Sequence, residues 1–173
     1  MSSFATGQDM EVSPVGAEGL IGIGVILNMQ PSPYWYVVHI DSTGYRIQAD
    51  AFERAFATMP GLRATTLAYI GRMLIYIVST TVCNRFHSNH QRLARWLLVI
   101  MEKSGQRSLP LTHDFIAQMV GEPRHAVTEA LHERRELGAI DYTRGRIELV
   151  DWDLLVAAAC ECYELAHPQP PDR

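Results

Sequence analysis

The sequence is poor in cysteine and carries no recognisable export or catalytic signature. Its three cysteines do not suggest a disulfide framework, and the N-terminus lacks the charged start and apolar run of a signal peptide. No Gly-x-Ser-x-Gly sequence, phosphate-binding loop or paired-carboxylate arrangement stands out, so nothing supports catalysis. We therefore expect a cytoplasmic protein that is not an enzyme.

Long hydrophobic runs are also lacking. Residues 20–29 are too few to span a bilayer, and residues 67–82 are interrupted by Arg72, so we expect no membrane association. Hydrophobic residues nevertheless make up 47% of the chain, which is enough for packed cores and argues against wholesale disorder. The 173 residues could form one large domain or two small ones.

An overall excess of positive charge is missing, because the formal net charge is -4. Residues 84–150 carry ten Arg or Lys against eight Asp or Glu and are the only net-positive segment. Contacts to phosphate need local positive charge rather than a basic whole chain. This distribution permits nucleic-acid binding without demonstrating it.

Residues 111–137 have the pattern of two short helices. Thr112 is a good N-cap, Gly121 suits a left-handed helix end, and Pro123 suits the first position of a new helix. Apolar residues between these signals lie on one face of the first helix, namely Phe115, Ile116, Met119 and Val120. Two such helices joined by a short turn predict a helix-turn-helix.

A hairpin is expected directly after these helices. Residues 139–142 and 146–149 alternate like half-buried strands, with a tight turn at residues 143–145. Helix, turn, helix and hairpin together are typical of a winged helix, whose second helix reads the DNA major groove. The alternative is a packed helical hairpin with no nucleic-acid role, because patterning alone does not prove function.

The N-terminal part predicts a few strands and a short helix. Residues 34–40 and 45–48 are rich in β-favouring residues and flank a turn, so we expect a hairpin there. Residues 51–58 should form a helix.

Helices are expected over residues 90–103 and 152–165, and a long helix is expected over residues 62–85. Its apolar residues Leu67, Ile70, Leu74 and Ile77 repeat at 3-4-3 spacing, which is typical of a coiled-coil seam. We expect this seam to form a homodimer, with a core helix inside one subunit as the alternative.

Several segments resemble the Crp/Fnr family of bacterial transcription regulators. They are residues 83–88 (CNRFHS), 91–98 (QRLARWLL), 111–121 (LTHDFIAQMVG), 142–147 (YTRGRI) and 160–163 (CECY). The resemblance covers roughly residues 16–165 and is specific from Cys83 onward. It implies a homodimer with an N-terminal β-roll sensor, a long dimer helix and a winged helix that reads a palindromic promoter site. RNA polymerase would be a further partner.

The expected fold is therefore α+β. We expect a partial β-roll at residues 1–57, a dimerisation helix at 58–85, a winged helix-turn-helix at 86–151, and a C-terminal helix and tail at 152–173. Residues 1–48 cannot supply all the strands of the family's β-roll, which would leave open sheet edges. The expected sensor is thus truncated. Three explanations are open: the chain is a fragment, its start is mis-called, or the sensor domain is degenerate.

The residues with which family members bind cyclic nucleotide or an iron–sulfur cluster are missing from the sequence. Family members that bind cyclic nucleotide hold its phosphate with an arginine, whereas this chain has Gly22-Ile-Gly24 and Ser32-Pro33 in the corresponding stretches. The N-terminal cysteine cluster of iron–sulfur members is absent too. We expect no cofactor and no response to cyclic nucleotide.

The resemblance also assigns roles in DNA binding. It implies base contacts from Arg124, His125 and Thr128, a phosphate contact at the helix that Thr112 caps, and backbone or minor-groove contacts from Arg144 and Arg146. His125 stands where the family is commonly acidic, and Glu129 where it is often basic or neutral. The preferred DNA sequence should therefore differ from the family's best-known site. Arg134 and Arg135 are expected on a solvated face with Glu133 and Glu136.

A metal site is not expected. Cys83, His87 and His90 would share one face of a helix and are ligand types that zinc accepts, but no fourth ligand is evident. Cys160 and Cys162 would point about 200° apart on a helix, which is poor for joint ligation.

The sequence thus favours a homodimeric, sequence-specific transcription regulator. The alternative is a sensorless interaction subunit that pairs with a full-length relative and modulates it.

Overall fold

The computed structural model describes residues 2–3, 9–29, 31–32 and 35–166. It begins with a short antiparallel ladder of β1 (Ser2–Ser3) and β2 (Asp9–Met10), followed by the 3-10 helix η1 (Ile23–Val25) and the helix α1 (Ala49–Thr58). The tail expected after residue 166 lies outside the described residues.

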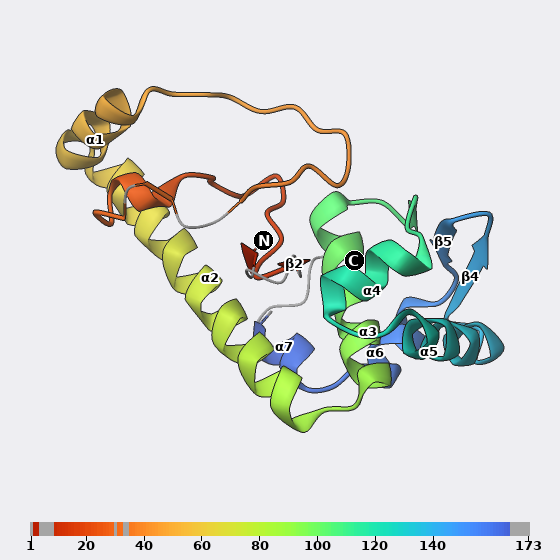
Figure 1. The fold of residues 1–173 in the computed structure, drawn as a ribbon. Helices are drawn as coiled ribbons and strands as arrows, with labels where there is room; N and C mark the ends of the chain where they lie inside the picture. Colours follow the sequence, from red (N-terminus) through yellow and green to blue (C-terminus); the bar gives the residue numbers. More distant parts are fainter. Residues whose placement is uncertain (1, 4–8, 30, 33–34, 167–173) are drawn as a thin grey trace.

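Residues 35–48 have no regular secondary structure, so the strands expected at 34–40 and 45–48 are wrong over their described residues. A two-stranded hairpin without a sheet to join is marginally stable at best. The segment instead crosses above the molecule between α1 and α4 (Figure 1). It is anchored where the His39 ring lies 4.9 Å from the Phe115 ring, while Val38 beside it is 78% exposed.

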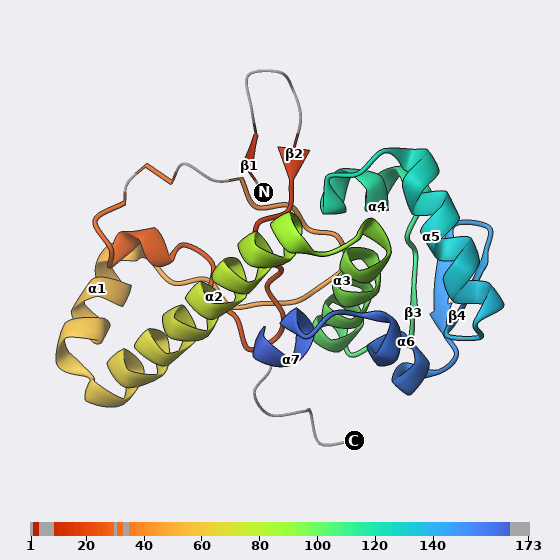
Figure 2. The ribbon, with the colours of Figure 1, turned by 90° about the horizontal axis from the view of Figure 1, so that it is seen from below.

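The helix α2 (Pro60–Phe86) is a long rod that runs from α1 to the start of α3 (Figures 1 and 2). Proline at its first position needs no hydrogen-bond partner there. Several large apolar side chains on this rod are exposed: Leu67, Leu74, Ile75, Val78, Val82 and Phe86.

By length and composition alone, α2 could cross a membrane, so the expectation that Arg72 excludes this was too strong. One such helix in the described part of the chain is weak evidence, because a core helix of a soluble protein can have the same length and composition.

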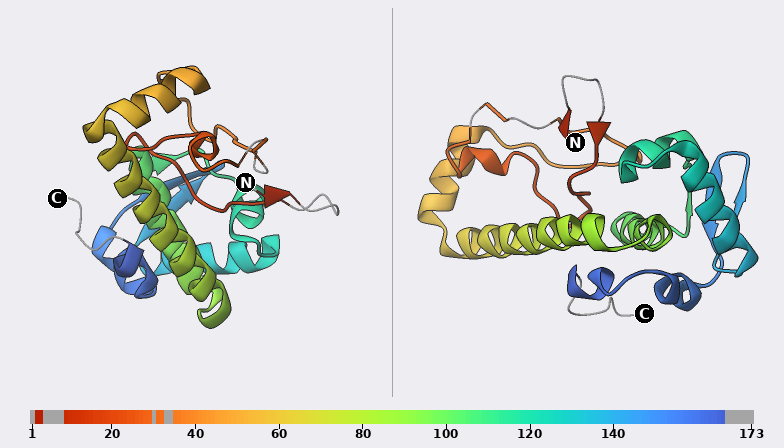
Figure 3. Two further views of the ribbon diagram at one scale, coloured as in Figure 1. Left: turned by 90° about the vertical axis from the view of Figure 1, so that its left-hand side faces the viewer. Right: turned by 60° about the horizontal axis from the view of Figure 1, so that its bottom comes forward.

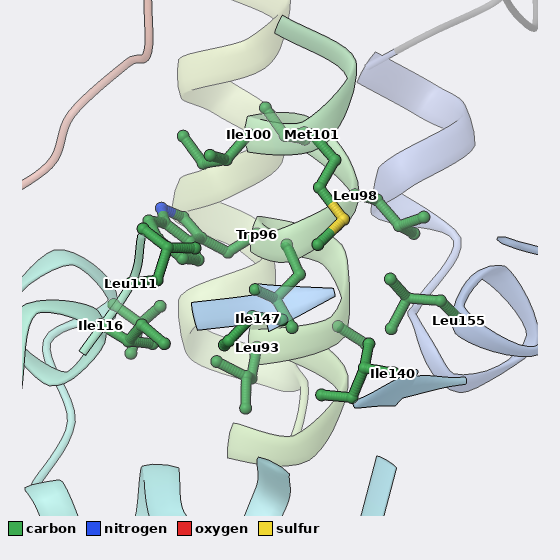
Figure 4. Close-up of a cluster of buried hydrophobic side chains, with 14 of the residues drawn as sticks. Leu93, Trp96, Leu98, Ile100, Met101, Leu111, Ile116, Ile140, Ile147 and Leu155 are labelled. Atoms are coloured by element: carbon green, nitrogen blue, oxygen red, sulfur yellow. The ribbon is translucent and has the colours of Figure 1, made fainter. Parts of the chain in front are cut away.

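The helix α3 (Asn89–Ser104) forms the centre of the C-terminal lobe. It begins with a capping box between Ser88 and Gln91 and ends at Gly105, whose φ of 65° is left-handed. Figure 4 shows its apolar side chains packed against the surrounding helices and strands. The core includes Leu93, Trp96, Leu98, Leu111, Ile116, Ile140, Ile147 and Leu155.

The winged helix-turn-helix has the expected order. It comprises α4 (His113–Val120), α5 (Arg124–Glu136), β4 (Ile140–Thr143) and β5 (Arg146–Leu149). The sequence did not reveal β3 (Ser108–Leu109), which pairs with the other side of β5 to give the order β3-β5-β4. The α+β class, the long helix and the winged helix are thereby confirmed.

The expected final helix is in fact two, α6 (Trp152–Ala158) and α7 (Cys162–Ala166). The break occurs because Ala159 is extended, with φ -82° and ψ -179°. It lets Cys160 and Cys162 turn to the same side, so the inference that they point apart was wrong. The helix α7 packs alongside the C-terminal half of α2 (Figure 3).

Candidate nucleic-acid interface

The turn between α4 and α5 is held by local caps and by a clamp from α3. The Thr112 hydroxyl accepts from the Phe115 N–H at 3.2 Å, as expected of an N-cap. Gly121 ends α4 with a φ of 71°. The guanidinium of Arg92 then donates to Glu122 Oε1 at 2.5 Å and to the Val120 carbonyl at 2.8 Å. This clamp fixes the angle at which α5 leaves the turn.

The first two turns of α5 present the residues expected to read DNA. Arg124, His125 and Thr128 are all exposed, and α5 lies on the opposite side of α3 from α2 (Figures 1 and 2). Glu129 is exposed on the same helix. The N-terminal half of α5 therefore offers mixed charge to solvent.

Neighbouring groups hold two of these side chains in place. The Thr128 hydroxyl donates to the Arg124 carbonyl at 3.0 Å, and His113 Nδ1 lies 2.9 Å from the same hydroxyl. Arg124 Nε lies 3.2 Å from Asp114 Oδ1, and both side chains remain about two-thirds exposed. Sequence patterns could not identify His113 or Asp114, since their contacts depend on how α4 meets α5.

The wing turns back through Arg144 and Gly145. Both have positive φ, 50° and 76°, which is the backbone of a two-residue hairpin turn. Arg146 donates from Nε to Ser108 Oγ at 3.2 Å, so its guanidinium is tied to β3. A Cβ on Gly145 would lie 3.6 Å from Thr112 Cγ2, which places the wing tip beside the start of α4.

His113 links the helical part to the wing. Its ring meets the Tyr142 ring edge-on at 5.3 Å. Burial lowers the pKa of His113, and the nearby Arg124 guanidinium lowers it further. The imidazole is therefore biased towards its neutral form, which suits a hydrogen bond with Thr128 better than a phosphate contact.

One expectation about α5 was wrong. Arg134 is 5% exposed and belongs to the interior, whereas it was expected on a solvated face. Arg135 is exposed as expected, where it pairs with Asp141 at 2.8 Å and lies over the Tyr142 ring. The guanidinium of Arg134 lies 3.6 Å from the Glu133 carboxylate, and a charged side chain can be buried when it is paired in this way.

The four residues expected to form the dimer seam do not share one environment. Leu67 and Leu74 are 52% and 55% exposed, and Ile77 is half-buried. Ile70 is only 9% exposed and packs within its own chain. The exposed apolar face of α2 therefore runs through Leu67 and Leu74 on to Val78 and Val82.

Residues 91–158 match the model of the Crp-like helix-turn-helix domain. This part of the chain therefore contains a Crp-like helix-turn-helix domain. It has the DNA-binding fold found in Crp/Fnr-type transcription regulators. No curated protein matches the sequence.

Solved structures of Crp/Fnr regulators are similar to this chain. FixK2 from Bradyrhizobium japonicum matches with a TM-score of 0.58 at 15% identity, covering 66% of this chain and 60% of FixK2. A mutant of CooA from Carboxydothermus hydrogenoformans matches with a TM-score of 0.52 at 21% identity, covering 62% and 53% respectively. The chain thus spans a little over half the length of the Crp/Fnr structures it matches.

Proposed function

We propose that the protein is a homodimeric, sequence-specific transcription regulator that binds promoter DNA through α5 and the wing and does not respond to cyclic nucleotide. The observation that carries the proposal is the exposed N-terminal half of α5, with Arg124 at its first position. An arginine there can donate two hydrogen bonds to the acceptors of guanine. In this proposal the protein acts in the cytoplasm, with RNA polymerase as a further partner.

The wing and the start of α4 would contact the DNA backbone. Arg144 is exposed at the wing tip, and Thr112 and Arg146 lie on the same side because β3 and α4 adjoin the wing. Contacts of this kind fix the position of the protein on the duplex without reading its sequence.

The exposed apolar face of α2 would be covered by a second copy of the chain. The α5 helices of the two copies should then lie about one helical turn of DNA apart, roughly 34 Å. A symmetric pair reads a palindromic site, in which each reader contacts one half. Pairing with a full-length relative would use the same face, and the measurements below distinguish the two.

Electrophoretic shift assays with promoter DNA, the region upstream of its own gene included, test the proposal. Arg124→Ala should relax base preference by about 1–3 kcal/mol, whereas Arg144→Ala should weaken all sequences alike. Arg54→Ala, which removes a remote exposed arginine on α1, is the matched control and should change neither. Absence of any salt-sensitive shift would contradict DNA binding. If light scattering shows a monomer and the protein co-purifies with a relative, the homodimer is contradicted but DNA binding is not.

A further inference from the structure

Four metal-ligating side chains meet where the end of α2 contacts the C-terminal helices. Cys83 lies in the last turn of α2 and His87 caps its end, while Cys160 follows α6 and Cys162 begins α7. One potential ligand atom from each side chain lies within 4.8 Å of every other. Residues far apart in the sequence thus present three sulfur atoms and one ring nitrogen to a common point.

Two distances between these ligand atoms resemble the edges of a tetrahedral metal site. Cys83 Sγ lies 3.4 Å from Cys160 Sγ, and Cys162 Sγ lies 3.6 Å from His87 Nδ1. A tetrahedral zinc ion with its usual bond lengths places two sulfurs about 3.8 Å apart and a sulfur and a nitrogen about 3.6 Å apart. Little movement is therefore needed for all four atoms to bind one ion.

We propose that Cys83, His87, Cys160 and Cys162 form a structural Zn²⁺ site. Three cysteines and one histidine are a recurrent ligand set for structural zinc. The four protein ligands leave no position open for water or substrate, so the site would stabilise the fold rather than catalyse a reaction.

The surroundings of His87 support this assignment independently. Its Nε2 atom lies 3.3 Å from the carboxylate of Glu161, while Nδ1 faces Cys162. Histidines that bind a metal through one ring nitrogen commonly donate from the other to a carboxylate, which fixes the tautomer and the ring orientation. Glu161 stands between the two cysteine ligands and would be a positioning residue rather than a ligand.

Burial and charge also fit a zinc–thiolate centre. Cys83, Cys160 and Cys162 are 0%, 5% and 2% exposed and form a cluster separate from the main core. Three thiolates around Zn²⁺ leave one net negative charge, which is costly in a buried place unless a cation is near. The guanidinium of Arg95, itself 4% exposed, lies beside Cys83 and supplies that charge.

His90 was the third residue of the set suggested by spacing alone, but it does not join the site. Its Nδ1 atom contacts the carboxylate of Glu133 on α5. His90 is therefore a matched control for His87, because both histidines lie at the junction of α2 and α3 and face a glutamate.

The ion would join segments that also pack against each other, since α7 contacts both α2 and α3. It would attach α7 to the end of α2, close to the point where the rod turns into α3 (Figure 2). A ligand set that includes both sides of this junction would restrict how the rod is oriented relative to the winged domain.

The test is metal analysis of the full-length chain purified from zinc-supplemented cells under reducing conditions. We expect elemental mass spectrometry to find one zinc ion per chain. Titration of the metal-free protein with Co²⁺ should produce the charge-transfer absorption of a cobalt–thiolate complex. Cys160→Ser and His87→Ala should each lose the zinc, and His90→Ala should keep it.

Wild-type protein that holds no zinc and takes up no Co²⁺ after reduction would overturn the proposal, whether or not the variants fold. A Cys83–Cys160 disulfide in the fresh protein, with no cobalt uptake once it is reduced, would overturn it as well. Zinc retained by Cys160→Ser but lost from His90→Ala would show that another ligand set is used. None of these measurements involves DNA, so they do not depend on the proposed function.

Discussion

Asp114 holds the side chain of Arg124 across the turn between α4 and α5, with 3.2 Å between Oδ1 and Nε. The arginine proposed to read a base is therefore partnered by a carboxylate on the same surface. In the proposed complex, DNA would have to displace this carboxylate before the guanidinium could reach a base, and the carboxylate would also repel phosphate.

Asp114→Asn should therefore tighten DNA binding, by roughly three- to tenfold at low salt, because a negative charge leaves the interface. Fluorescence anisotropy with labelled promoter DNA over a series of salt concentrations measures the effect. Asp50→Asn on α1 makes the same charge change at a remote exposed position and should leave affinity unchanged. Equal affinities for wild type and Asp114→Asn would place the DNA elsewhere.

Arg92→Ala should lower the free energy of unfolding by about 1.5–3 kcal/mol, since it removes charged hydrogen bonds from a largely buried site. The loss leaves Glu122, whose side chain is 14% exposed, without its cation. Urea unfolding followed by circular dichroism gives the value. Arg54→Ala breaks an exposed ion pair on α1 and should cost less than about 0.5 kcal/mol. Similar losses for the two variants would mean that the clamp contributes little.

Glu11 should make stability depend on pH. Burial raises the pKa of its carboxyl from 4.5 to about 7, although the Trp96 indole donates to it at 3.1 Å and opposes the shift. The folded chain then binds a proton more tightly than the unfolded chain does. The contribution of this group to stability is full below pH 4.5 and is lost as the pH rises through about 7.

Thermal unfolding of wild type and Glu11→Gln over this interval tests the effect. The variant should lack the decline between about pH 4.5 and about pH 7, because a neutral amide cannot titrate. His39 lies 3.8 Å from Glu11, and burial lowers the pKa of His39. The effect of His39 on the pH dependence of stability therefore has the opposite sign, and it remains in both proteins. Parallel curves for the two proteins would show that the Glu11 carboxyl stays ionised.

Glu161→Gln tests the positioning role in the proposed zinc site. It should weaken zinc affinity by about tenfold, at the low end of the usual range because the Glu161 side chain is 68% exposed. Competition with a chromophoric chelator measures the affinity. Glu164→Gln changes the same charge on α7 and should bind zinc as wild type does. Unchanged zinc affinity of Glu161→Gln would show that this carboxylate does not position His87, and it would leave the assignment of the four ligands intact.

The winged domain could be predicted from the sequence because its signals are local. Thr112 caps a helix and Gly121 ends it, and the apolar spacing between them identifies the buried face. The residues proposed to contact DNA are exposed as expected. Their partners Asp114 and His113 could not be found in this way, since the contacts arise only when two helices meet.

Non-local features were missed for the same physical reason. Residues 35–48 have strand-forming composition, but a strand forms only beside a partner, and composition does not reveal whether one is available. The break at Ala159 has no glycine or proline to announce it, so Cys160 and Cys162 were treated as parts of one helix. Burial of Arg134 and Ile70 likewise depends on which element covers them.

The strand β5 is held from both sides, by β4 within the wing and by β3, which precedes α4 in the chain. A peptide cut to start at α4 would keep the helix-turn-helix and the wing but would expose one edge of β5. It would also lack Trp96 and the other α3 side chains that cover Ile116 and Ile147 (Figure 4). The smallest piece able to stand alone must therefore start no later than the capping box at Ser88.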